Sequence, residues 1–180
     1  PVAAYGSNDG WPGGTMLRSL DGGTTWDTAL ELEPPSATVG VAMDALVTAD
    51  YRVADSAGIL HVSLISGELE SVSEALMFAG QNHFAYGVDG RWEIIAARTV
   101  TLESDGTYTL QDMLRGRFGS EWAMGLHAAG DWLVLLDSGD LTYLTAGSEA
   151  INQSRLYRAI TYGRTLETDG NLEHTYKAIA

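Results

Sequence analysis

The chain has 180 residues, of which 24 are acidic and 10 basic, giving a formal net charge of −14 at pH 7. This charge repels phosphate backbones and anionic lipid headgroups, which disfavours nucleic-acid binding and membrane-surface roles. Cysteine is absent, which excludes disulfides, thiolate nucleophiles and cysteine-ligated zinc. No apolar run exceeds five residues, the length of residues 132–136, which is too short to cross a bilayer.

Short β-segments separated by turns run along the whole sequence. Glycine is abundant, and five Asp-Gly pairs occur where a hairpin turn would need a positive φ. The pattern is typical of a mainly β fold, an antiparallel β-sandwich or barrel-like domain. The expected strands are residues 15–19, 39–43, 60–66, 92–100, 107–110, 132–136, 141–145 and 156–162.

One or two short helices are expected among these strands. The spacing of Ser71 and Glu74 fits a capping box, and Gly80 follows as a stop signal, which predicts a helix of about two turns. A second candidate is residues 148–155, although its apolar face is small.

The break in the sequence is Glu33-Pro-Pro-Ser36, because two prolines disfavour both helix and interior strand. We therefore expect a Gly-rich β-hairpin appendage at residues 1–36 and a main β-rich domain at residues 37–180. A single domain over residues 1–180 is the alternative. The chain opens without an initiator methionine, so we interpret it as a fragment of a longer polypeptide.

The sharpest short motif lies in the first hairpin and resembles the Asp-box of sialidase-type propellers, S-x-D-x-G-x-T-W. Its residues here are Ser19, Asp21, Gly23, Thr25 and Trp26. In such a box the serine and aspartate bind backbone groups of the turn, and the tryptophan packs beneath it. Propellers repeat the box in successive blades, whereas this chain has it once. We therefore interpret it as a structural turn.

Enzyme motifs find little support in the sequence. A glycosidase needs two carboxylates at a defined separation, and no landmark selects a pair. The four histidines show no metal-ligand spacing, and no G-x-S-x-G or phosphate-binding loop is present. Residues 137–140 resemble part of a calcium loop but fit a hairpin turn better. We expect no catalytic residues, no metal and no cofactor.

Basic residues are concentrated in the segment from Met113 to Glu121. Arg115 and Arg117 flank Gly116, and Glu121 is close in sequence. A guanidinium can bridge carbonyls and a carboxylate, so the segment predicts a fixed, hydrogen-bonded turn. A contact with an anion or a partner is the functional alternative.

This segment also resembles a known family. Residues 107–123, followed by His127-Ala-Ala-Gly-Asp131 and a hydrophobic strand at 132–137, resemble the C-terminal region of the large tail-tip proteins of phages and gene transfer agents. Residues 17–23, 62–74 and 90–95 are similar to the same region. The departures, Met113 for a leucine and Ser120 for a threonine, are conservative.

The resemblance implies a structural component of a tail tip or baseplate, located in the virion tail and made in the bacterial cytoplasm. Such a protein contributes to tail assembly and host attachment, contacts other tail and baseplate proteins, and forms a homo-oligomer, a trimer, in the full-length assembly. No nucleic-acid contact or membrane insertion is expected. The family motif carries over, with a structural role, to Leu114, Arg115, Gly116, Arg117, Gly119, Glu121 and His127 to Gly130.

The alternative function is a carbohydrate-binding module that recognises host cell-surface glycan. The chain has five tryptophans and eight tyrosines that could stack on sugar rings. Trp11 is the best candidate contact because neighbouring glycines and a proline hold it in a loop.

Overall fold

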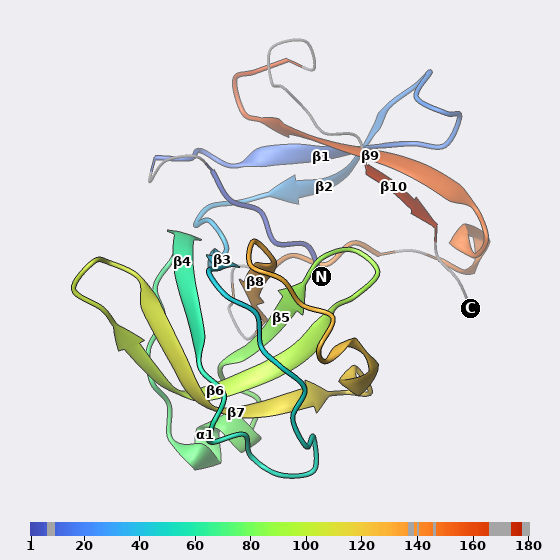
Figure 1. Ribbon diagram of the computed structural model, residues 1–180. Coiled ribbons are helices and arrows are strands. Elements are labelled where there is room, and N and C mark those ends of the chain that lie inside the picture. The colour runs from blue at the N-terminus through green and yellow to red at the C-terminus, as the bar shows by residue number, and fades with distance from the viewer. Residues whose placement is uncertain (7–9, 137–138, 140, 146, 166–173, 178–180) are drawn as a thin grey trace. The chain divides into compact units, whose positions relative to one another are not determined.

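The computed structural model describes residues 1–6, 10–136, 139, 141–145, 147–165 and 174–177 (Figure 1). The fold is mainly β with antiparallel sheets, which confirms the expected fold class. The chain divides into two compact units. The barrel unit comprises residues 37–139, and the sheet unit comprises residues 1–36 together with 140–180.

The barrel unit is a closed six-stranded barrel in the order β3-β4-β7-β6-β5-β8. Every neighbouring pair is antiparallel, and β3 closes the barrel by pairing with β8. Closure gives the backbone groups of each strand a partner on both sides. The strands are β3 (Val39–Ala42), β4 (Leu60–Ser66), β5 (His83–Gly87), β6 (Glu93–Leu102), β7 (Tyr108–Arg117) and β8 (Trp132–Leu135).

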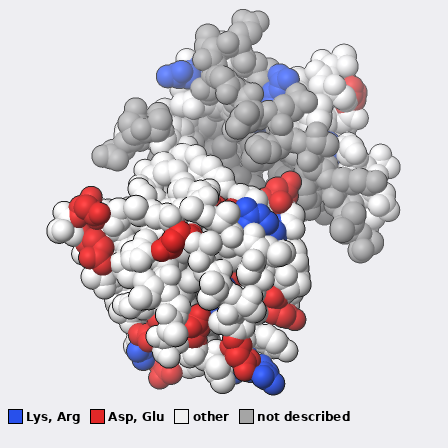
Figure 2. All heavy atoms as spheres, viewed as in Figure 1, with Lys and Arg blue, Asp and Glu red and all other residues white. Residues whose placement is uncertain are grey.

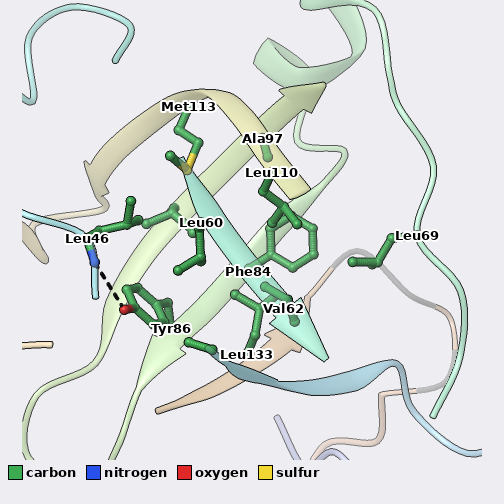
Figure 3. Packing of buried hydrophobic residues seen from close by; sticks show 12 residues of the cluster. Leu46, Leu60, Val62, Leu69, Phe84, Tyr86, Ala97, Leu110, Met113 and Leu133 are labelled. Atoms are coloured by element: carbon green, nitrogen blue, oxygen red, sulfur yellow. Dashed lines mark hydrogen bonds between the residues drawn. The ribbon is translucent and has the colours of Figure 1, made fainter. Parts of the chain in front are cut away.

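The hydrophobic core fills the inside of this barrel (Figure 3). In strand β4, alternate residues of the sequence point into this core: Leu60 and Val62 are fully buried, whereas the intervening His61 is exposed. This is the period of two that a strand requires. The inward residues of the other strands include Phe84, Leu110, Met113 and Leu133.

The helix α1 (Glu74–Phe78) lies in the loop between β4 and β5, and its N-cap differs from the expected one. The capping residue is Ser73, whose side chain accepts a hydrogen bond from the amide of Leu76 at 3.2 Å. The hydroxyl of Ser71 instead bonds both the amide and the carbonyl of Val100 on β6, at 2.9 Å each. The expectation that Ser71 caps the helix was therefore wrong, because its hydroxyl is hydrogen-bonded to the backbone of β6 instead.

The second helix candidate was also wrong over most of its length. Only Ser148–Ala150 form a 3₁₀ turn, η2, and the chain then enters strand β9 (Ser154–Thr161). Another 3₁₀ turn, η1 (Glu121–Ala123), follows β7. Among the described residues, no helix is long and apolar enough to cross a membrane.

The sheet unit contains a four-stranded sheet in the order β10-β9-β1-β2. Its strands are β1 (Gly14–Ser19), β2 (Asp27–Leu32), β9 and β10 (His174–Lys177). Strand β1 pairs with β9 along its whole length. For this reason the residues after 139 group with the N-terminal segment rather than with the expected domain 37–180. The boundary near residue 36 coincides with the Pro-Pro break.

The remaining differences from the expected strands have local causes. Strand β7 continues far beyond Leu110, through the left-handed residues Asp112 and Gly116. Segment 141–145 forms only an isolated bridge between Thr142 and Val2. Strands β2, β5 and β10 were not predicted.

Candidate functional site

The family-motif residues of β7 and the loop after it converge on a buried ionic cluster in the barrel unit. Among the residues that the structure describes, Arg115 on β7 is the largest fully buried side chain, and Glu93 at the start of β6 is equally inaccessible. Their contact is bidentate: Nε of Arg115 donates to Oε1 of Glu93 at 2.8 Å, and Nη2 donates to Oε2 at 2.9 Å. This fork geometry is the strongest form of a charge-assisted pair.

The remaining donor of Arg115 reaches into the loop between β3 and β4. Its Nη1 donates to the carbonyl of Val47 at 3.1 Å and to Oδ2 of Asp55 at 3.3 Å. The backbone amide of Gly116 adds a third hydrogen bond to Glu93, at 2.9 Å. One guanidinium thus joins two strands and a long loop.

His127 extends the cluster from Glu93 to Asp131. Its Nε2 lies 2.8 Å from Oε2 of Glu93, and its Nδ1 lies 3.3 Å from Oδ2 of Asp131. The imidazole stacks on the ring of Tyr86, with 4.0 Å between centroids. Because a carboxylate only accepts, both contacts are hydrogen bonds when both ring nitrogens carry a proton.

Arg91 closes the far end of the cluster. It pairs with Asp131 through two hydrogen bonds of 2.6 Å and donates to the carbonyl of Leu126, also at 2.6 Å. The backbone amide of Ala128 donates to Asp131 as well, at 3.1 Å. The loop that carries His127 is therefore held at several points.

The charges of the ionic cluster balance when the histidine is protonated. Its members are Asp55, Arg91, Glu93, Arg115, His127 and Asp131, three of each sign. Burial raises the pKa of Glu93, but the hydrogen bonds from His127 and Arg115 outweigh burial and hold that pKa below its ordinary value. Buried charges are tolerated when they are paired and hydrogen-bonded in this way.

Chemically, this arrangement is suited to holding loops in place. Each charged group in it already faces a partner of opposite sign, and Glu93, Arg115 and Asp131 are almost inaccessible to solvent. Within the described part of the chain, no group of three or more His, Cys, Asp or Glu side chains is arranged to hold a metal ion.

The expected partner of the arginines was wrong in one respect. Glu121 does lie close to the turn, because a Cβ on Gly116 would come within 2.8 Å of its Cα. The carboxylates that bind Arg115, however, are those of Glu93 and Asp55, which are 22 and 60 residues away in sequence. Gly116 has a φ of 58°, so glycine is required there both for conformation and for space.

The other motif residues have distinct positions. Leu114 points outward and packs with Met77 of α1. Gly119 lies in the turn after β7. The backbone amide of Gly130 donates a hydrogen bond to the carbonyl of Ala42 at 2.8 Å. Arg117 is partly exposed and lies outside the ionic cluster.

Four members of the cluster were not singled out from the sequence: Asp55, Arg91, Glu93 and Asp131. A usable signal was present for Glu93, because it begins the otherwise apolar run Glu93-Ile-Ile-Ala-Ala97. An acid within a buried strand needs a cation, and Arg115 lies on the neighbouring strand.

The Asp-box has the expected local geometry in the turn between β1 and β2. The amides of Thr24 and Thr25 donate to Oδ1 of Asp21 at 3.0 and 2.9 Å, and the amide of Gly23 donates to the hydroxyl of Ser19 at 2.8 Å. Nε1 of Trp26 donates to the carbonyl of Gly23 at 3.0 Å. These contacts stabilise the turn itself.

The Asp-box is expected to open in acid. Hydrogen bonds from Thr25 and Ser19 lower the pKa of Asp21 from its ordinary 3.8 to about 2. Because the pKa is lower in the folded chain, this stabilisation is present above the unfolded value and is lost as the pH falls from about 4 to about 2. An NMR titration should show the Thr24 and Thr25 amide shifts moving in that window. They should stay constant in Asp21→Asn, and a wild-type midpoint near 4 would contradict the prediction.

Trp11, the expected glycan contact, is partly buried and lies against Gly6. The loop tryptophan therefore has a packing role, and its glycan contact stays a prediction. The expected turn at 137–140 lies mostly outside the described residues.

A comparison with known protein families found a match that covers the barrel unit. A family model described as Rcc01698-like, C-terminal, matches residues 37–134, which is more than half of the chain and almost all of the barrel unit. The match includes all six members of the ionic cluster. A search of curated proteins found no match. The chain belongs to the Rcc01698-like C-terminal family.

Proposed function

We propose that the chain is a structural, non-enzymatic component of the tail tip or baseplate of a phage or gene transfer agent particle. In that role it contributes to tail assembly and host attachment, contacts other tail and baseplate proteins, and belongs to a trimeric assembly in the virion tail. The proposal starts from the resemblance of residues 107–137 to the C-terminal region of such tail-tip proteins.

The observation that carries the proposal is the ionic cluster. The residues that give rise to the resemblance are the ones that form it: Arg115 and Gly116 bind Glu93, and His127 joins Glu93 to Asp131. Their charged groups are buried against one another. Such a motif supports a rigid scaffold for assembly better than a reaction centre.

The acidic surface supports the same role. Figure 2 shows acidic side chains at several places on the visible face of the barrel unit, with fewer basic ones. A net charge of −14 repels DNA, so a wall or outer position in a tail fits better than a surface that grips the genome.

Immunogold electron microscopy tests the proposal. Antibodies raised against the chain should label the tail tip of particles from the source strain, and pre-immune serum should not. Absence of label on intact particles, with the epitopes accessible in disrupted ones, would contradict it. A glycan array, with Trp11→Ala as its control, would then test the carbohydrate-binding alternative.

A further inference from the structure

Two of the three phenylalanines lie at the surface of the barrel unit. Phe84 is fully buried in the core, whereas Phe78 is 59% exposed and Phe118 is 81% exposed. Large aromatic side chains are normally the main contributors to a core. Exposed apolar side chains indicate a contact site only where they gather on one surface.

Phe78 and Phe118 lie on the same side of the barrel. Helix α1, which ends at Phe78, packs through Met77 on Ala96 and Leu114, the outward residues of β6 and β7. Phe118 follows β7 directly, and its ring lies 5.8 Å from that of His83, which pairs with Ala96. We call this surface the α1–turn face; it comprises Glu74, Phe78, Arg117 and Phe118.

The backbone at Phe118 is strained. Phe118 and Gly119 have φ values of 55° and 81°, and the amide of Ser120 bonds the carbonyl of Arg117 at 3.2 Å. Two positive φ values in a tight turn are those of a type I′ turn, which favours asparagine, aspartate or glycine. A bulky residue held there with its ring exposed indicates a role beyond folding.

Charge also distinguishes this face. Four of the five arginines of the barrel unit bind carboxylates: Arg52, Arg91, Arg98 and Arg115. Arg117 forms no salt bridge with a described residue, and its buried Nε has no hydrogen-bond partner among them. Glu74, exposed in the first turn of α1, likewise has no salt bridge within the described residues.

We propose that the α1–turn face binds the same face of a second copy of this chain. Each copy then offers Glu74 to Arg117 of the other, while Phe78 and Phe118 are covered. A self-contact of this kind produces two-fold pairs, so it goes beyond the proposed trimer and adds a second type of contact.

The size of the face sets the strength of this contact. The two phenylalanine rings provide at most about 300–500 Å² per copy, less than the ~800 Å² per partner of a standard interface. The other acidic surfaces of two copies repel each other, which limits the contact to this face. We therefore expect weak, reversible pairing of the isolated chain.

Analytical ultracentrifugation of the chain, from low micromolar to millimolar concentration, tests the proposal. The wild type should show a monomer–dimer equilibrium, and Phe118→Asn and Phe78→Ser should each weaken it about tenfold or more. Asparagine tolerates a positive φ, so Phe118→Asn keeps the turn. The matched control is Leu102→Ser, because Leu102 is 61% exposed at the far end of β6 and should leave pairing unchanged.

Mixing two charge variants tests the face-to-face arrangement. Arg117→Glu and Glu74→Arg should each pair poorly alone, and an equimolar mixture should pair again because opposite charges then meet. A wild type that stays monomeric at millimolar concentration would overturn the proposal, and so would dimers unaffected by Phe118→Asn. Neither result would bear on tail labelling, which tests the proposed function separately.

Discussion

Substitution of Glu93 by glutamine is expected to lower the free energy of unfolding of the barrel unit by about 3–5 kcal/mol. The glutamine keeps the size of the side chain but removes the negative charge that Arg115 and His127 share. Breaking a buried pair in this way leaves a buried cation without its main partner. Urea denaturation followed by far-UV circular dichroism measures the change.

The matched control is Asp50→Asn, which removes an exposed pair. Asp50 and Arg52 form their salt bridge at 2.8 Å with 43% and 73% of the side chains exposed. Exposed pairs contribute about 0–1 kcal/mol, so this variant should unfold almost as the wild type does. Equal losses in Glu93→Gln and Asp50→Asn would show that the ionic cluster is not a principal support of the fold.

The Glu93→Gln substitution should also change how the stability of the protein responds to acid. The pKa of Glu93 is lower in the folded chain, so its contribution is present above the unfolded pKa and is lost as the pH falls through the folded one. The wild type should therefore lose stability in acid more steeply than Glu93→Gln does. Parallel stability curves for the two proteins would contradict this.

The second large effect is expected from Phe84→Ala. Phe84 is fully buried in the barrel core, and removing a buried phenylalanine costs about 3–5 kcal/mol through lost burial and the cavity left behind. The chain supplies its own controls: Phe78→Ala and Phe118→Ala remove exposed rings and should each change stability by about 0.5 kcal/mol or less. Chemical denaturation of the three variants measures the difference, and a loss for Phe118→Ala comparable to that for Phe84→Ala would contradict the packing described.

Features determined by neighbouring residues could be predicted from the sequence. The Asp-box turn depends on contacts between residues at most four positions apart. Strand β4 was predicted with its observed bounds, since one alternating segment contains its whole signal. The fold class followed from many such segments together.

Features that depend on distant pairing could not be predicted from the sequence alone. Glu93 contacts Arg115, which is 22 residues away in sequence, and His127, which is 34 residues away. Local spacing pointed instead to Glu121, the acid nearest in sequence to Arg117. Closure of the barrel, and not local spacing, selects the partner. The same holds for Ser71, whose hydroxyl is taken by Val100, and for β9, whose pairing with β1 decides where the C-terminal segment belongs.

The pairing of β1 with β9 has a consequence for how the protein is made. During translation Ser19 leaves the ribosome long before its strand partner Leu156, about 10 s earlier at typical elongation rates. In that interval the whole segment 37–139 is synthesised, and its barrel pairs only its own strands. The nascent β1–β2 hairpin must wait with one edge of β1 unpaired, held in shape by the Asp-box, until the barrel is complete and β9 arrives.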